Sequence, residues 1–331
     1  MRNFKVVVVT ILLVLMILSL GACKSEETTL EKEQNVLEQL DIVVDKNTIF
    51  DKAFVFDAFS AVKEDGTVLF IDQNTDGRSE IFEWTDISSI ATAETHSVGL
   101  KKDGTVVAVG KNKSDCCEVS DWTNIVEIAA ASGETYGLKN DGTVVMAGYS
   151  VEGKNECVEW TDIVELCVEE SFMVGLKSDG TVVSEGSNLN GRRYVMEWTD
   201  IVDIDTSYYG TVGVKSDGTV VYTGEDNFDI SSVLQWTDIK SVSVGPSCIA
   251  GLKNDGTVVT VSDERVTWDD DLSNLTDIEF ICTGKRSIIC RKTDGSTVYV
   301  GNPYKCFDDP NLNVYDCNGR RTTEEANLLN Q

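Results

Sequence analysis

Residues 98–110 read VGLKKDGTVVAVG, and the Asp-Gly pair inside this stretch recurs through most of the chain. Seven of these pairs are spaced by 38 residues five times and by 39 residues once. They begin at Asp65, Asp103, Asp141, Asp179, Asp217, Asp255 and Asp294. An Asp-Gly pair between two β-rich runs is a strong hairpin signal, because Asp and Gly both tolerate the positive φ of a tight turn. Each repeat is therefore predicted to contain a β-hairpin.

A tryptophan keeps the same period and marks the start of five of the seven repeats. Leu275 takes its place in the last repeat and Lys46 in the first, so that the repeats start near residues 46, 84, 122, 160, 198, 236 and 275. The stretch WTNIVEIAA, from Trp122, predicts a turn followed by an apolar strand before each hairpin. Valines shortly before the tryptophans, as at Val119, Val158 and Val195, predict a fourth strand.

The repeat length decides the fold class. Repeats of 20 to 50 residues indicate solenoids, propellers or arrays, and one short unit cannot bury both of its faces. Four antiparallel strands repeated around an axis make a propeller blade. We therefore predict an all-β protein, a seven-bladed β-propeller of four-stranded antiparallel blades.

Two further positions repeat in register. The first holds an isoleucine expected to lie between blades: Ile49, Ile87, Ile125, Ile163, Ile201, Ile239 and Ile278. The second holds a glycine where a side chain would obstruct close packing: Gly99, Gly137, Gly175, Gly213 and Gly251.

The pattern at residues 98–110 resembles the repeat of the regulator-of-chromosome-condensation propeller family, over roughly residues 46 to 301. The short repeats are similar to those of compact bacterial members, including a secreted β-lactamase inhibitor with a seven-bladed propeller. The first and last repeats lack the tryptophan, and Asp72 and Ser262 replace the strand-end glycine in the first and sixth. The resemblance implies a propeller.

The predicted propeller domain occupies residues 40–301. Residues 41–45 read DIVVD and lie where other repeats have their outermost strand, so we expect them to pair with the last blade and close the ring. Residues 23–39 are predicted to be a charged tether, and residues 302–331 a C-terminal extension.

The first residues have the pattern of an export signal. Residues 1–22 combine a basic start, an apolar run too short for a comfortable membrane span, and a small-residue exit. The sequence LGAC, ending at Cys23, resembles the lipobox of bacterial lipoproteins, which implies a lipid on Cys23 and an anchor at the outer face of the cell membrane. The alternative is an ordinary secreted protein with a cysteine at that place.

The charge of the mature chain disfavours nucleic acid as a partner. Removal of Arg2 and Lys5 with the signal leaves 26 Lys and Arg against 56 Asp and Glu, a formal charge of −30. Such a surface repels phosphate backbones and anionic lipid headgroups.

Nine cysteines follow Cys23, an odd number, so at least one is expected to be free or paired between molecules. Cys306 and Cys317 are the disulfide candidate, because they are close in sequence and flank a loop-like stretch. Cys167 and Cys282 occupy equivalent repeat positions and are expected to be small buried residues.

One stretch fits the pattern of a calcium loop. Its candidate ligands are Asp72, Asn74, Asp76, the Arg78 carbonyl, Glu80 and Glu83. Against this interpretation, strands are expected on both sides, and Glu83 aligns with acids of repeats that have no such loop. No other cofactor is indicated.

Binding is expected on the face where the repeats differ. The connections there carry aromatic and arginine side chains, which are common in interface hot spots. The candidates are Phe56, His96, Tyr136, Tyr149, Phe172, Arg192, Arg193, Tyr208, Tyr209, Phe228 and Tyr304. About half are expected to pack onto their own loops, and His96, the single histidine, is expected to be a blade-packing or loop residue.

These patterns favour a non-catalytic, membrane-anchored extracellular module, expected to be a monomer, that binds a protein, peptide or glycan as a receptor or adhesion protein does. With a single histidine in the chain, nucleophilic triads and His-based zinc sites are disfavoured. Two alternatives remain: an inhibitor of a secreted enzyme such as a β-lactamase or another hydrolase, and a carbohydrate-active or glycan-binding surface protein.

Overall fold

The computed structural model describes residues 42–43, 58–63, 65–72, 78–112, 114–131, 133–149, 155–225, 228–263, 275–283, 287–294 and 296–301. Within these ranges the chain forms seven antiparallel sheets of three strands each, in which the middle strand pairs with both others. The strands are, sheet by sheet, β1 (Ile42–Val43), β2 (Ala58–Lys63) and β3 (Val68–Asp72); β4 (Ile87–Thr92), β5 (His96–Lys101) and β6 (Val106–Gly110); β7 (Ile125–Ala131), β8 (Glu134–Lys139) and β9 (Val144–Gly148); β10 (Ile163–Val168), β11 (Phe172–Lys177) and β12 (Val182–Gly186); β13 (Ile201–Ser207), β14 (Gly210–Lys215) and β15 (Val220–Gly224); β16 (Ile239–Val244), β17 (Cys248–Lys253) and β18 (Val258–Ser262); β19 (Ile278–Thr283), β20 (Ser287–Lys292) and β21 (Thr297–Gly301).

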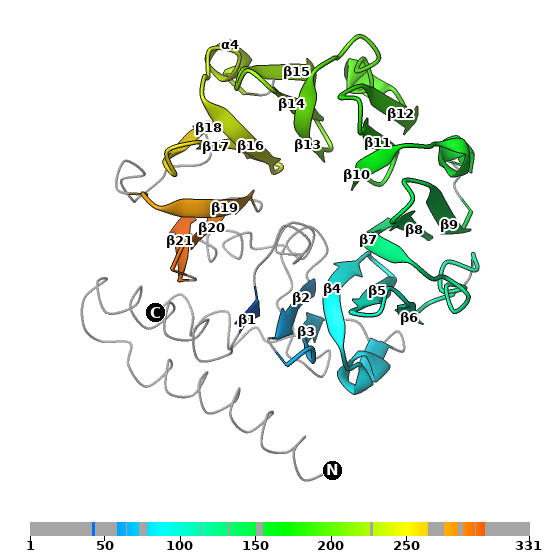
Figure 1. Ribbon diagram of the computed structural model, residues 1–331. Coiled ribbons are helices and arrows are strands. Elements are labelled where there is room, and N and C mark those ends of the chain that lie inside the picture. The colour runs from blue at the N-terminus through cyan, green and yellow to red at the C-terminus, as the bar shows by residue number, and fades with distance from the viewer. Residues whose placement is uncertain are drawn as a thin grey trace, which may run out of the picture.

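The sheets stand around a common centre, and in the second to seventh sheets the first strand lies innermost (Figure 1). The all-β class and the repetition of sheets in register with the Asp-Gly pairs are confirmed.

The predicted fourth strand is wrong at the three valines that suggested it. Val158 lies in a short 3₁₀ helix, and Val119 and Val195 lie in irregular segments outside any strand. The short helices between sheets are η1 (Arg78–Glu83), η2 (Asn155–Glu159), η3 (Leu189–Gly191) and the α-helical turn α4 (Ile230–Val233). The valines still pack inward: Val119 and Val195 are buried. Apolar burial alone therefore suggested a strand where the backbone turns.

The pairing of the N-terminal strand also differs from the prediction. Ile42 and Val43 pair with Lys63 and Val62 of β2, in the first sheet, and not with the last sheet. Ile42 pairs with Lys63 as Ile87 pairs with Lys101 in the next sheet, so Ile42 has the pairing of the repeated isoleucine. Ile49, which the period predicted there, lies outside the described residues. The same Ile-Val dipeptide starts β7, β10 and β13, which explains why this pair fits that register.

The hairpin turns have a different geometry from the one predicted. Gly104 has a φ of 81°, whereas Asp103 is not among the residues with positive φ. Gly104 N donates to Lys101 O, and Lys101 N donates to Thr105 O, the bonds of a three-residue hairpin loop with a glycine bulge. The Asp103 carboxylate accepts from the Thr105 amide and hydroxyl, at 3.0 and 2.6 Å. Asp is therefore present as a hydrogen-bond acceptor, not as a residue of positive φ.

Backbone hydrogen bonds join each sheet to the next at this end of the strands, which we call the turn face. Ile125 N donates to Gly104 O of the preceding sheet at 3.0 Å, and Ile163 N donates to Gly142 O at 3.0 Å. A Cβ on Gly142 would lie 3.0 Å from the Cα of Asp162. Glycine is thus required both by its φ and by the close approach of the following sheet.

The hydrophobic core lies between neighbouring sheets. One cluster joins Tyr136 and Leu138 of the third sheet to Ile163 and Leu166 of the fourth. Trp160 packs against this cluster. Each sheet therefore depends on its neighbour to cover one face, as the repeat length predicted.

Candidate functional site: the loop face and the central cavity

The opposite ends of the strands form the loop face, where the connection between the first two strands meets the end of the third. Ser187 N donates to Ser171 O at 2.7 Å, and Glu225 N donates to Tyr209 O at 2.9 Å, so that backbone bonds tie the two segments together. The loop face therefore presents variable side chains on a fixed backbone.

The described binding candidates divide by exposure. Tyr149 and Tyr208 are exposed, by 66% and 53%, and Tyr209 and Arg193 are partly buried. The other described candidates, which pack inside, are His96, Tyr136, Phe172, Arg192 and Phe228. Phe56 and Tyr304 lie outside the described residues. The buried five support the loops and leave little surface for a partner.

Arg192 is a buried cation that orders the loops of the fourth and fifth sheets. Its side chain is 2% exposed and lies between the rings of Phe172, at 4.5 Å, and Tyr208, at 5.4 Å. Its Nη1 donates to Tyr208 O at 2.7 Å, and its Nη2 donates to Ser171 Oγ at 2.6 Å. Cation–π contacts strengthen when water is excluded, so this arginine fixes the backbone and ring of Tyr208.

Arg193 is held in the same segment. Its Nη1 donates to Gly186 O, and its Nη2 donates to Ser184 O at 2.7 Å. Burial lowers the pKa of this guanidinium from its ordinary value. Both arginines therefore fasten the connection after β12 to the sheets beneath it.

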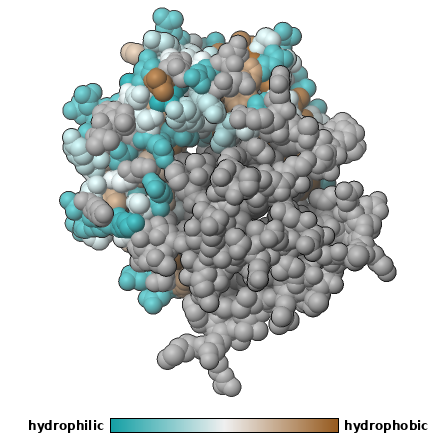
Figure 2. Space-filling view, turned by 180° about the vertical axis from the view of Figure 1, so that it is seen from behind, coloured by the Kyte–Doolittle hydropathy of each residue, from teal (hydrophilic) through white to brown (hydrophobic). Residues whose placement is uncertain are grey.

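That connection exposes apolar side chains that were not among the predicted binding residues. Tyr194 is 71% exposed and Met196 is 84% exposed, whereas Val195 between them is buried. This segment is irregular and contains turns, and it is not a strand, so a strand-type alternation in the sequence gives no sound signal for the exposure of Tyr194 and Met196. The described surface visible in Figure 2 is mostly hydrophilic, with a few hydrophobic side chains.

An aromatic cluster continues from Tyr208. The rings of Tyr208 and Tyr209 meet edge to face at 5.3 Å, and Tyr209 meets Phe228 edge to face at 6.5 Å. Such pairs stabilise by about 0.5–1.5 kcal/mol beyond their burial. Tyr208 is thus an exposed ring supported from below by an arginine and from the side by a second tyrosine.

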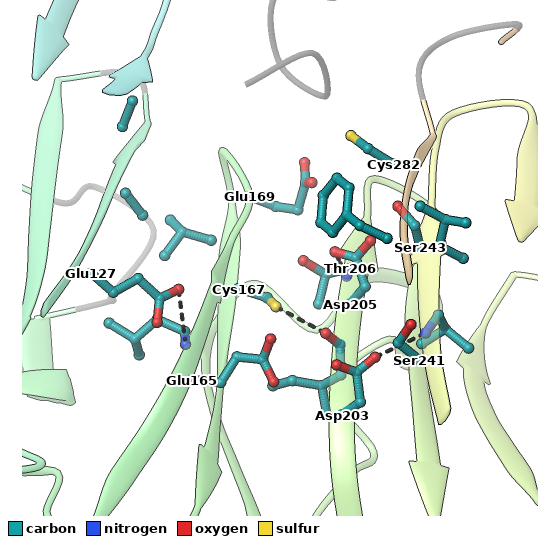
Figure 3. A pocket seen from close by; sticks show the side chains of 18 of the residues that line it. Glu127, Glu165, Cys167, Glu169, Asp203, Asp205, Thr206, Ser241, Ser243 and Cys282 are labelled. Atoms are coloured by element: carbon teal, nitrogen blue, oxygen red, sulfur yellow. Dashed lines mark hydrogen bonds between the residues drawn. The ribbon is translucent and has the colours of Figure 1, made fainter. Parts of the chain in front are cut away.

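A second feature is a cavity of about 180 Å³ among the innermost strands. Figure 3 shows acidic side chains along it, from the first strands of successive sheets. Glu127 Oε1 accepts from Leu166 N of the next sheet at 3.4 Å, and Asp203 Oδ2 accepts from Val242 N at 2.8 Å. These carboxylates therefore bind the backbone of the following sheet, which assigns them a role in packing.

Asp205 makes the same connection from deeper in the cavity wall. Its Oδ2 accepts from Val244 N of the next sheet at 2.7 Å, and its Oδ1 accepts from Thr206 N at 2.8 Å. Burial raises the pKa of Asp205 to about 6, although the two backbone hydrogen bonds oppose that rise. Cys167, which was expected to be buried, lines this cavity with Cys282, and its Sγ donates to Ile204 O at 3.5 Å.

The structure describes only part of the predicted calcium site. Asn74 and Asp76 lie outside the described residues, and Asp72 is described only as the end of β3. Arg78 begins η1, and Glu80 and Glu83 of this helix are exposed, so a 3₁₀ helix stands where a strand was expected. In the part of the chain that the structure describes, no group of three or more His, Cys, Asp or Glu side chains is arranged to hold a metal ion. Calcium binding stays a prediction.

The export signal, Cys23, Cys306 and Cys317 likewise lie outside the described residues. None of the described helices has the length and apolar character needed to cross a bilayer.

Comparison with known proteins supports the fold. No family model matches the sequence, and no curated protein matches it. Solved structures do. Human WBSCR16 is 14% identical with a TM-score of 0.51, and the match covers 71% of this chain and 79% of that one. Prp20p of Saccharomyces cerevisiae, also called yeast RCC1, is 14% identical with a TM-score of 0.50, over 68% of this chain and 73% of that one.

The chain has an RCC1-like propeller fold. The ectodomain of the receptor kinase CR4 of Physcomitrella patens is similar too, at 14% identity and a TM-score of 0.50, and this chain spans 64% of its length. At such identities the likeness concerns the fold alone. The resemblance noted in the repeats is therefore supported as to architecture.

Proposed function

We propose that this chain is a non-catalytic binding module, lipid-anchored through Cys23 at the outer face of a bacterial membrane, whose loop face contacts a protein partner. The proposal takes the sheets as a ring that acts as a rigid support. The observation that carries it is the exposed Tyr208 ring, held in place by the buried Arg192.

Immobility is what makes this tyrosine a suitable anchor. Ordering a side chain at an interface costs about 0.5–1.5 kcal/mol, and a ring that is already fixed avoids most of that cost. Tyrosines of this kind are enriched among the residues that dominate binding energy. A propeller of similar fold binds proteins: Prp20p of yeast binds Gsp1p and histones.

The exposed side chains of the neighbouring connection extend the surface. Tyr194 and Met196 belong to a segment that two hydroxyls of the fifth sheet hold: Thr211 Oγ1 donates to Arg192 O at 2.9 Å, and Thr223 Oγ1 donates to Gly191 O at 2.8 Å. A partner would therefore meet aromatic and thioether groups on an anchored backbone. The formal charge of the whole chain, −28, favours a protein partner over nucleic acid.

The binding surface is tested by capture with the mature domain from an extract of bacterial surface proteins. We expect Tyr208→Ala combined with Met196→Ala to reduce capture of the partner by about tenfold or more, the loss expected of a hot spot. The matched control is Val164→Ser, which removes an equally exposed apolar side chain near the turn face. Equal capture by all three proteins would show that the partner binds elsewhere.

The anchor is tested separately by metabolic labelling with a fatty-acid analogue. We expect label on the full chain and none on Cys23→Ala, which should be released into the medium because a single lipid-bearing residue supplies the attachment. Retention of Cys23→Ala in the membrane fraction would contradict the anchor without affecting the binding surface.

A further inference from the structure

Two adjacent cysteines lie in the connection after β6, between the second and third sheets. Cys116 is 1% exposed, and Cys117 is partly exposed. Asn112 holds their loop: its Oδ1 accepts from Cys117 N at 2.9 Å, and its Nδ2 donates to Glu118 Oε1 at 2.7 Å. Asp115, just before the pair, has a φ of 61°, which turns the chain sharply.

The single histidine is buried beside these thiols. His96 Nε2 lies 2.9 Å from Thr135 Oγ1, and Thr135 Oγ1 donates its one hydrogen to Cys116 O at 2.6 Å. Nε2 must therefore be the donor to Thr135, which leaves Nδ1 unprotonated in the neutral ring. Nδ1 is fully buried and has no hydrogen-bond partner of normal geometry among the described residues. A basic nitrogen thus lies enclosed at a cysteine pair, a cost that packing alone does not explain.

The two thiols have different acidities. A hydrogen bond from Cys117, together with His96, lowers the pKa of Cys116 to about 5, whereas the same interaction and burial raise the pKa of Cys117. The Cys116 thiol donates to Lys111 O at 3.4 Å. Of the two sulfurs, Cys116 is the more easily deprotonated, which fits it for the attacking role and Cys117 for the resolving role.

We propose that Cys116, Cys117 and His96 form a peroxide-reactive dithiol site that cycles between two thiols and a disulfide. The Cys116 thiolate attacks one oxygen of hydrogen peroxide, the O–O bond breaks, and the departing hydroxide takes a proton to form water. The sulfur of Cys117 then attacks the resulting sulfenic acid at Cys116. Cys117 loses its proton to the departing hydroxide, which forms a second water. Two thiols are oxidised by two electrons, and one peroxide is reduced to two waters.

The short spacing makes the oxidised form reversible. Bridged cysteines usually have Cα atoms 4.4–6.8 Å apart, whereas a trans peptide places adjacent Cα atoms about 3.8 Å apart. A disulfide between neighbours is therefore strained, and strained disulfides are the easily reduced ones. This site is independent of the proposed protein-binding surface.

The test uses the mature domain with its own internal reference. The reduced protein is treated with equimolar hydrogen peroxide, quenched with N-ethylmaleimide and digested with trypsin, which releases residues 114–139 with both cysteines and no others. We expect this peptide to lose two mass units and to escape alkylation, and dithiothreitol to reverse both changes. Cys290 is the reference, because burial raises the pKa of its thiol to about 12. Its oxidation should be slower by about tenfold or more.

Two variants separate the roles. Cys117→Ser should accumulate a sulfenic acid at Cys116 that dimedone traps, because the resolving thiol is gone. His96→Asn should slow peroxide consumption while the circular dichroism spectrum stays that of the wild type. Oxidation of residues 114–139 no faster than Cys290, or products limited to sulfonic acids and intermolecular dimers, would overturn the proposal.

Discussion

The fourth and the seventh sheets fill the same two neighbouring positions with different pairs of residues. In the fourth sheet the indole of Trp160 lies over Gly175, where a Cβ would come within 2.9 Å of the ring. In the seventh sheet Leu275 replaces the tryptophan, and Cys290 occupies the glycine position, fully buried. Tryptophan thus occurs with glycine in the fourth sheet, and leucine occurs with cysteine in the seventh. The repeated glycine is present to make room for an indole of its own sheet.

The most damaging change should be Gly175→Cys, which gives the fourth sheet the cysteine of the seventh but keeps its tryptophan. The new side chain would overlap Trp160, and overpacking of this kind costs about 1–3 kcal/mol. Urea unfolding of the mature domain measures the loss. A change below about 0.5 kcal/mol would mean that the indole can move aside.

The second prediction restores the pair. Adding Trp160→Leu to Gly175→Cys recreates the combination of the seventh sheet, so the double variant should be more stable than the sum of the single changes by about 1 kcal/mol or more. A double-mutant cycle in urea gives this coupling. Simple additivity would show that the two positions are independent.

The third prediction concerns Asp205, at whose repeat position the seventh sheet has Cys282. The folded pKa of Asp205, about 6, is higher than that of an unfolded aspartate, so folding takes up a proton between these values. The stability linked to that proton is present below about pH 4 and is lost as the pH rises through about 6.

This pH dependence should be absent from Asp205→Asn. The difference in thermal midpoint between wild type and variant should therefore change from pH 4 to pH 7, by about 2–4 °C for each 1 kcal/mol. A constant difference would place the titration on another group. The comparison with the variant is needed because many other carboxyl groups titrate at low pH.

The smallest effect should come from the hairpin turns, where the two sheets agree. Asp179 accepts from the amide and hydroxyl of Thr181, and Asp294 accepts from those of Ser296. These hydroxyl and amide bonds lower the pKa of both aspartates, so their contribution is lost as the pH falls below the ordinary carboxyl range. Asp179→Ala and Asp294→Ala should lower the thermal midpoint slightly and equally. A large difference between them would mean that the turns are not equivalent.

The sequence correctly predicted the features that recur with the 38-residue period. The positions of the hairpins, the repeated isoleucines and the intervening core follow from residues that recur in register, and the structure places β4 to β21 accordingly. The fourth strand was predicted wrongly because burial of Val119 and Val195 does not specify backbone conformation. The pairing of Ile42 was missed because a two-residue strand carries too little pattern to fix its register.

The candidate site was less predictable, since exposure of a loop side chain depends on neighbours from other repeats. Arg192 was predicted as a binding residue, but Phe172 and Tyr208, which lie 20 and 16 positions away, enclose it. The pairing of His96 with Thr135 spans 39 residues. Such contacts join residues of different sheets, and a short sequence pattern does not predict them.

The backbone bonds of the turn face bear on how the chain acquires its shape. In each described instance a later isoleucine amide donates to the glycine carbonyl of the unit made just before it, as Ile201 does to Gly180. The carbonyl acceptor of each of these bonds is therefore synthesised before its amide donor. Sheets can therefore be added in the order of synthesis. The backbone bonds of the turn face form one part of each junction, beside carboxylates such as Asp203 and the apolar core between sheets. This part does not depend on which side chains the loops carry.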